Sequence, residues 1–185
     1  LISRLQKKQP DLHFEFYQMT AVVQVEMLKA EKLDIGFLRV PRNDKEIEDH
    51  VIFTETYSLV VPENHKIDSS NFKGLHEFAD ENFILTPRSV GERYFDNIIS
   101  LCATAGFSPK IVHESVYEQA TIKLVENNMG ISIVPTSFKE GFNTRVKFIE
   151  LNNIPQRLQL SMAWKKNNTN PSLLNMIEVI RKSVK

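Results

Sequence analysis

Cysteine, net charge and long apolar runs are all scarce in this sequence. A single cysteine among 185 residues excludes a disulfide within the chain and fits a reducing compartment. The 23 basic and 23 acidic residues cancel, whereas a nucleic-acid-binding surface normally shows a basic excess. No run of about 18 apolar residues occurs, and the chain does not open with the basic and apolar regions of a signal peptide. We therefore expect a cytoplasmic globular protein that neither spans a membrane nor contacts DNA through these residues.

The short motifs of common enzyme classes are also missing. The sequence contains no G-x-S-x-G elbow, no Walker loop, no G-x-G-x-x-G and no H-E-x-x-H. Metal sites normally pair their histidines closely, but the five histidines here are scattered: His13, His50, His65, His76 and His113. We accordingly expect no enzymatic activity, no metal and no cofactor, although catalytic groups can converge from distant positions.

The stretch from Ile111 to Pro135 predicts a strand, a helix and a second strand in direct succession. Ser115 and Glu118 have the S-x-x-E spacing of a capping box, so a helix is expected to begin just after Ser115. Its apolar face is predicted to contain Tyr117, Ala120, Thr121, Leu124 and Val125.

The end of that helix is marked by residues that tolerate left-handed backbone, namely Asn127, Asn128 and Gly130. The apolar run at 131–134 is typical of a parallel sheet covered on both faces. The whole stretch therefore predicts a βαβ unit.

The remaining periodicity predicts further alternating helices and strands. An apolar stripe of Leu1, Ile2 and Leu5 indicates a helix, and the alternation of Leu12, Phe14 and Phe16 indicates a strand. Thr20 is the expected N-cap of the next helix, with Ala21, Val25 and Leu28 on one face. More strands are expected at 35–38, twice within 51–61, and at 83–85, 146–151 and 158–162, and more helices at 72–78, at 92–105 and from Pro171. Asn170 should cap that last helix, with Leu174, Ile177 and Val184 on its inner side. This order favours an α/β fold with parallel strands.

Two interruptions divide the pattern. They lie at Pro62–His65 and at Asn152–Pro155, where turn residues break the strand pattern. The family resemblance given in the next paragraph implies that the chain passes between two lobes at these places. We expect lobe I to comprise residues 1–61 and 155–185, and lobe II to comprise residues 62–154. Such lobes form a cleft, and open α/β sheets bind ligands at the carboxyl ends of strands, beside helix N-termini.

Four segments together resemble the effector-binding domain of LysR-type transcriptional regulators. Glu114, followed by I-x-L-V from Ile122 and G-I-x-I-V-P from Gly130, is similar to that family's signature. The helix from Glu92, with its exit C-x-x-A-G-F-x-P, matches a second family segment. Further matches occur at 33–37 and 158–164, so the resemblance covers essentially the whole chain.

This resemblance implies two Rossmann-like lobes joined by two crossover segments, as in periplasmic binding proteins of type II. It also implies a winged helix-turn-helix before Leu1, so DNA would be bound only through that missing domain. Family members bind a small effector between the lobes, and they pair this domain as an antiparallel homodimer within a homotetrameric full-length protein. The alternative is a free-standing periplasmic-type binding protein of similar architecture.

Candidate ligand-binding residues lie at the predicted edges of the cleft. Thr20 stands at a helix N-terminus, which favours an anion, and Arg39 directly follows a buried strand. From the other lobe we expect contributions from the loop before the helix at 92–105, namely Arg88, Ser89 and Arg93. Arginine binds carboxylates in a bidentate manner. The expected effector is therefore a small carboxylate.

The resemblance adds positions to this set. In the family, the positions of Thr20 and Ala21 hold hydroxyl residues that contact the effector, and Arg39 matches an arginine of regulators of aromatic-compound catabolism. Ala21 departs from that pattern, so the effector's identity cannot be carried over. The remaining candidates are Tyr94 in the loop-helix segment, Gln119 in the second helix, and Leu160, which matches a residue of the pocket wall.

Each candidate also has a simpler structural interpretation. Thr20 can act only as a cap, and loop arginines such as Arg88 and Arg93 are usually solvated. Tyr94 can belong to the core, and Gln119 can lie on the surface. Cys102 occupies an apolar helix stripe and is predicted to be a small buried hydrophobe.

Overall fold

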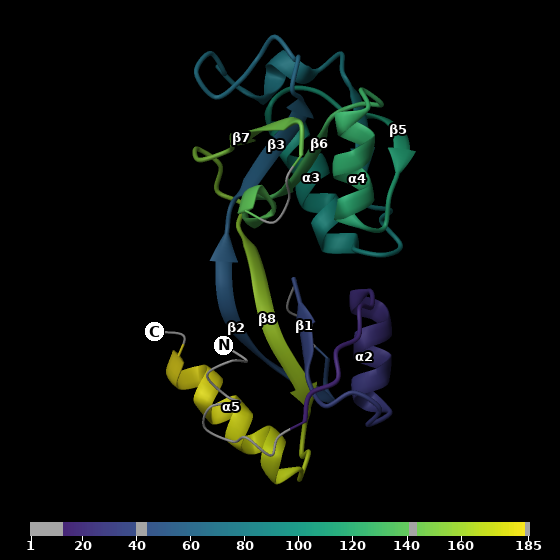
Figure 1. Ribbon diagram of the computed structural model, residues 1–185, viewed down its shortest axis with the longest axis vertical. Coiled ribbons are helices and arrows are strands. Elements are labelled where there is room, and N and C mark those ends of the chain that lie inside the picture. Colours follow the sequence, from purple (N-terminus) through teal and green to yellow (C-terminus); the bar gives the residue numbers. More distant parts are fainter. Residues whose placement is uncertain (1–12, 40–43, 141–143, 184–185) are drawn as a thin grey trace. The chain divides into compact units, whose positions relative to one another are not determined.

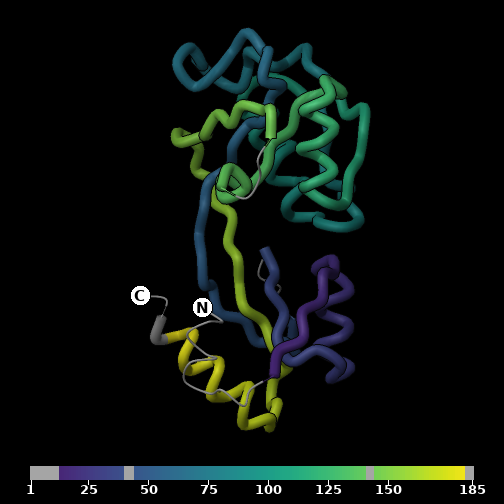
Figure 2. The backbone as a smooth tube through the Cα atoms, viewed as in Figure 1, coloured from purple at the N-terminus to yellow at the C-terminus, as the bar shows by residue number. Residues whose placement is uncertain are grey.

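The computed structural model describes residues 13–39, 44–140 and 144–183 of the chain (Figures 1 and 2). The chain divides into two compact units. Unit 1 comprises Leu1–Thr54 and Gln159–Lys185, and unit 2 comprises Glu55–Leu158. The division falls within strand β2 (Ile47–Glu55) and at the start of strand β8 (Leu158–Lys165), so two strands carry the chain from one unit to the other.

In the described part of unit 1, three strands form a sheet with one helix on each face. The strand order is β1 (Gly36–Leu38), β8 and β2, and β1 runs antiparallel to β8. Helix α2 (Ala21–Lys29) packs on one face, where Val25, Leu28 and Ala163 are buried. Helix α5 (Pro171–Ser183) packs on the other face, against Met162 and Trp164. Successive residues of β8 thus point alternately to the two cores.

Two sequence predictions for unit 1 are wrong. Residues 13–20 form no strand, because no described strand pairs with them and a strand requires backbone partners. On α5, Leu174 is 53% exposed and not buried, whereas Ile177 is buried as predicted, together with Leu173, Met176 and Ile180. The predicted helix containing Leu1, Ile2 and Leu5, together with Leu12 and Val184, lies outside the described residues.

Unit 2 is organised around β3 (Tyr57–Pro62), whose six residues are all buried. Strands β6 (Ser132–Pro135) and β7 (Val146–Glu150) flank it, and both run antiparallel to it. Strands β4 (Asn82–Leu85) and β5 (Lys110–Glu114) form a parallel pair, and a parallel bridge between Phe83 and Ile131 joins that pair to the start of β6.

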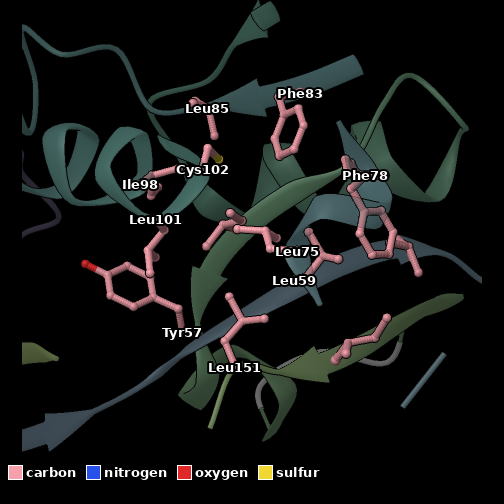
Figure 3. Close-up of a cluster of buried hydrophobic side chains, with 14 of the residues drawn as sticks. Tyr57, Leu59, Leu75, Phe78, Phe83, Leu85, Ile98, Leu101, Cys102 and Leu151 are labelled. Atoms are coloured by element: carbon pink, nitrogen blue, oxygen red, sulfur yellow. The ribbon is translucent and has the colours of Figure 1, made fainter. Parts of the chain in front are cut away.

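Two cores cover the faces of this sheet. Helix α3 (Glu92–Thr104) contributes Ile98, Leu101 and Cys102 to the larger core, which also contains Tyr57 and Phe83 (Figure 3). The smaller core lies under helix α4 (Glu118–Glu126), where its members are Val60, Ile84, Ile122, Val125 and Val134. Two short 3-10 helices, η1 (Leu75–Phe78) and η2 (Thr136–Glu140), complete the unit.

The predicted βαβ unit exists, with two corrections. Strand β4 lies between β5 and the start of β6, and β6 meets β3 in antiparallel fashion, so the sheet is mixed and not parallel throughout. The Ser115–Glu118 capping box is wrong. Helix α4 begins at Glu118 with Tyr117 as its N-cap, because the Ser115 N–H instead donates to the Leu85 carbonyl (2.9 Å), which holds it beside β4.

The buried face of α4 is also shifted from the predicted one. Thr121, Ile122 and Val125 are buried, whereas Tyr117 is 52% exposed. Thr121 and Val125 are buried as predicted, whereas Tyr117 precedes the first helical residue and so does not belong to the helix face.

Candidate functional site

The start of α2 has the features of an anion-binding helix terminus. Thr20 has extended backbone, and its Oγ1 accepts a hydrogen bond from the Val23 N–H (3.5 Å), as expected for an N-cap. The Thr20 carbonyl accepts from the Gln24 N–H (3.0 Å). The N–H groups of Ala21 and Val22 have no acceptor within the helix, because the first turn has none to offer. They leave partial positive charge at this end of unit 1.

Strand β1 ends close to this terminus. Residues 30–35 are a short connection from α2 to β1, so β1 starts beside the end of α2 and runs back toward its start. Arg39 directly follows β1 and is half-buried, as are Thr20 and Ala21. Leu160 on β8 is half-buried as well. Thr20, Ala21 and Arg39 thus belong to the start of α2 and the end of β1. Leu160 is two residues before Met162 on β8, so strand alternation directs it to the α5 face and away from the other three.

Arg88 in unit 2 is held by acidic partners of its own unit. Its Nε and Nη2 donate to the two oxygens of Asp96 (2.9 and 3.0 Å), and Nη2 also donates to Glu92 (2.6 Å). This guanidinium lowers the pKa of Asp96 from its ordinary value, chiefly through the side-chain hydrogen bond. Ser89 and Arg93 are exposed. The observed partners of Arg88 thus tie the loop to the first turns of α3.

Tyr94 is buried in the larger core of unit 2. Its hydroxyl donates to the Ile133 carbonyl (2.9 Å), and its ring stacks on Tyr57 with 6.1 Å between centroids. Burial raises the pKa of Tyr57. These contacts agree with the alternative interpretation of Tyr94 as a core residue. Gln119 lies exposed in the first turn of α4.

One polar residue near the unit 1 candidates was missed by the sequence analysis. Ser161 lies on β8, is fully buried, and its Oγ has no hydrogen-bond partner in the described structure. The available signal was a serine inside the otherwise apolar end of a strand, Leu160 to Trp164.

Metal and thiol chemistry find no support in the described ranges. Among residues 13–39, 44–140 and 144–183, no group of three His, Cys, Asp or Glu is arranged to hold a metal ion. Cys102 is fully buried, as predicted, and burial raises the pKa of its thiol to about 12, which disfavours the reactive thiolate. Nor does this part of the chain contain a helix of the length and apolar character that crossing a membrane requires.

Comparison with known proteins identifies the family. A model of the LysR substrate binding domain matches residues 1–185. The chain belongs to this LysR family. Among curated proteins, it is 26% identical to the HTH-type transcriptional regulator AlsR of Bacillus subtilis, covering 97% of this chain and 59% of AlsR. It is also 26% identical to the HTH-type transcriptional regulator CatR of Pseudomonas putida, covering 94% of this chain and 60% of CatR.

Solved structures show the same fold. The LysR family regulator CbnR superposes with a TM-score of 0.84 at 24% identity, covering 100% of this chain and 64% of CbnR. The effector-binding domain of QuiR in complex with shikimate superposes with a TM-score of 0.84 at 24% identity, covering 99% of this chain and 88% of the QuiR domain. The BenM effector-binding domain with its effector benzoate superposes with a TM-score of 0.80 at 23% identity, covering 98% of this chain and 83% of the BenM domain. The predicted α/β fold of the periplasmic-binding-protein type II class is confirmed, and so is the resemblance to LysR regulators. The LysR chain described here spans about 60% of the curated relatives AlsR and CatR.

Proposed function

We propose that this chain is the ligand-sensing part of a bacterial LysR-type transcriptional regulator and that it acts in the cytoplasm without catalysis. The supporting observation is the family match over residues 1–185, together with solved neighbours described as effector-binding domains with benzoate or shikimate. A free-standing periplasmic-type binding protein is less well supported, because AlsR and CatR are both transcriptional regulators. DNA binding is assigned to residues outside this chain, since its net charge is zero.

The proposed effector is a small carboxylate held at the start of α2. The N–H groups of Ala21 and Val22, which have no acceptor within the helix, offer hydrogen bonds to an anion, and the helix dipole adds a favourable field. Arg39 is assigned as a charged partner because it follows β1, which runs back toward the start of α2. A charge-assisted hydrogen bond of this kind contributes about 1.5–3 kcal/mol.

Regulation requires the effector to distinguish two states of the full-length protein. An effector with equal affinity for both states would shift nothing, whereas moving a balance from 1:99 to 99:1 takes about 5.5 kcal/mol of preference. Two or three charge-assisted contacts that form in only one state are sufficient in magnitude. The proposed switch therefore needs few residues, and Arg39 is the leading one.

A thermal-shift screen tests this proposal. The chain is mixed with aromatic acids, dicarboxylates and amino acids, and a ligand at 100 times its Kd should add about 2.7 kcal/mol of stability. Arg39→Ala is expected to weaken binding of the best acid by roughly 10- to 100-fold, the equivalent of one charge-assisted contact.

The matched control is Arg145→Ala. Arg145 is exposed, pairs with Glu126 in unit 2 and was never a candidate, so its loss should leave ligand affinity unchanged. If no acid raises the melting temperature of the chain, the carboxylate assignment is overturned. If an acid binds Arg39→Ala as tightly as wild type, Arg39 is removed from the site.

We further propose that the chain forms a homodimer through exposed apolar residues, within a homotetrameric full-length protein. Unit 2 exposes Ile111, Val112 and Tyr117 along β5 and just after it. In the described structure, β5 pairs only with β4, so its other edge offers unpaired backbone groups. Unit 1 exposes Phe16 and Tyr17 at 68% and 59%. A second copy of the chain would cover both surfaces if unit 1 of one copy met unit 2 of the other.

A further inference from the structure

We propose that the effector is a hydroxylated carboxylic acid whose hydroxyl group hydrogen-bonds to Ser161. This inference rests on the function proposed above and narrows the class of ligand. The observation behind it is a buried hydroxyl on β8 that has no partner, on the same face of the sheet as the start of α2.

An unpartnered buried hydroxyl is unusual. Buried polar groups in proteins nearly always have a hydrogen-bond partner, because losing contact with water is costly unless another bond replaces it. The other fully buried serines of the sheets follow this rule. Ser132 donates to the Ile84 carbonyl (2.7 Å), and Ser58 is hydrogen-bonded to Thr136 (2.9 Å). Ser161 is equally buried, and its Oγ lacks such a bond.

The strand register places this hydroxyl on the α2 side of unit 1. Side chains alternate along a strand, and Ala163 packs in the core under α2 while Met162 and Trp164 pack against α5. Ser161, two residues before Ala163, therefore points to the α2 face as well.

The same register places it near the first turn of α2. Ala163 lies opposite Gly36, and a Cβ on Gly36 would meet Gln24 Oε1 at 2.8 Å and Leu28 Cδ1 at 3.2 Å. Ser161 lies opposite Leu38, two residues further along β1. That step is about 6–7 Å along the strand, or about four residues of helix, in the direction of the α2 N-terminus. The hydroxyl and the free N–H groups thus belong to one end of unit 1.

The start of α2 and the Ser161 hydroxyl suit different chemical groups of a ligand. The free N–H groups of the helix and Arg39 suit a carboxylate, which only accepts hydrogen bonds. A serine hydroxyl both donates and accepts, so it suits a ligand hydroxyl at a second position. Ala21, at the start of α2, carries no hydroxyl, and Ser161 supplies one from the neighbouring strand instead. A site built to pair with a ligand hydroxyl discriminates strongly against the analogue that lacks it.

The first experiment needs no ligand. Ser161→Ala is compared with Ser132→Ala in thermal unfolding of the chain, because both serines are buried in strands and only Ser132 has a partner. Ser132→Ala should lower the Tm by roughly 2–4 °C, whereas Ser161→Ala should leave it unchanged or raise it. A drop for Ser161→Ala equal to that for Ser132→Ala would mean a structural hydrogen bond, for instance to an internal water, and would overturn the inference.

The second experiment measures ligand preference. Calorimetric titration compares benzoate with 4-hydroxybenzoate, and cyclohex-1-enecarboxylate with shikimate, on wild type and Ser161→Ala. Wild type is expected to bind one hydroxylated acid at least tenfold more tightly than its parent, and Ser161→Ala should lose that preference while keeping its affinity for the parent acid. If wild type binds acids but Ser161→Ala keeps the preference, only this inference fails. If wild type binds none of the four and no other acid of the thermal-shift screen, the proposed carboxylate site fails and the inference fails with it. If only acids without a hydroxyl group bind, the inference alone fails.

Discussion

At the scale of single residues, Gly130 is needed because the backbones of two strands approach each other closely at this position. Gly130 precedes β6 and has a φ of +147°, which side chains rarely adopt. A Cβ at this position would lie 2.7 Å from the carbonyl oxygen of Asn82. That same oxygen accepts the Ile131 N–H (2.8 Å), which joins β6 to β4. The absence of a side chain at Gly130 therefore allows the two strands to meet.

Gly130→Ala is expected to lower the free energy of unfolding by roughly 1–3 kcal/mol, because it combines strained backbone with a clash against a carbonyl that cannot move freely. Urea denaturation measures the change. Gly106→Ala is the matched control, since Gly106 has a φ of +89° but no atom within 4 Å of an added Cβ. A loss at Gly130 no larger than that at Gly106 would show that the close approach to Asn82 has no energetic weight.

Residue roles were predictable from the sequence where the cause is local. Asn128 was expected to take left-handed backbone, and its φ is +59°. Cys102 was expected in the core and is there. Tyr94 and Arg88 could not be resolved in advance. The partner of the Tyr94 hydroxyl is the carbonyl of Ile133, far along the chain, and the acidic partners of Arg88 become relevant only once α3 has formed.

At the scale of elements, the helix starts show what local chemistry can and cannot specify. Thr20 and Asn170 were predicted as caps, and each accepts a hydrogen bond from the first turn of its helix. The start of α4 was predicted wrongly, because Ser115 is held by the backbone of β4 and its hydroxyl donates to the Tyr117 carbonyl. Apart from the strand expected around Phe14 and Phe16, the strands were located well, yet their directions were not predicted. Hydrophobic patterns show which residues are buried, whereas pairing depends on contacts between distant segments.

Asn170→Ala tests the cap of α5. Asn170 Oδ1 accepts the Ser172 N–H (3.0 Å), so its removal should cost about 1 kcal/mol of unfolding free energy, measured by urea denaturation. Asn170 Nδ2 also donates to Asp34 (3.2 Å), which links α5 to the segment before β1. Asn170→Ser separates the two effects, because serine caps well but cannot reproduce the bond to Asp34. Equal losses in both variants would assign the stabilisation to Asp34 and not to the cap.

At the scale of the whole molecule, the family and the α/β fold class were predictable because the matching segments are spread over the entire chain. The two passages between units were expected at 61–62 and 154–155, and the structure divides at 54–55 and 158–159. The proline and asparagine clusters mark turns, whereas the division follows packing, since β3 and the residues around it are buried in the core of unit 2. The homodimer, in contrast, was expected only because of the resemblance to LysR-type regulators, and no sequence pattern predicted it.

The proposed homodimer gives the last prediction. Val112→Glu places a charge on the exposed edge of β5, where the wild-type side chain is 37% exposed, so the folded chain should tolerate it while a second copy should not. Sedimentation equilibrium is expected to show a dimer for wild type and a dissociation constant raised by at least tenfold for Val112→Glu. Leu174→Glu is the matched control, because Leu174 is also exposed but lies on α5 of unit 1. Dissociation by Leu174→Glu with none by Val112→Glu would move the interface to α5, and a monomeric wild type at high concentration would reject the homodimer. Circular dichroism of each variant ensures that any dissociation reflects the interface and not loss of the fold.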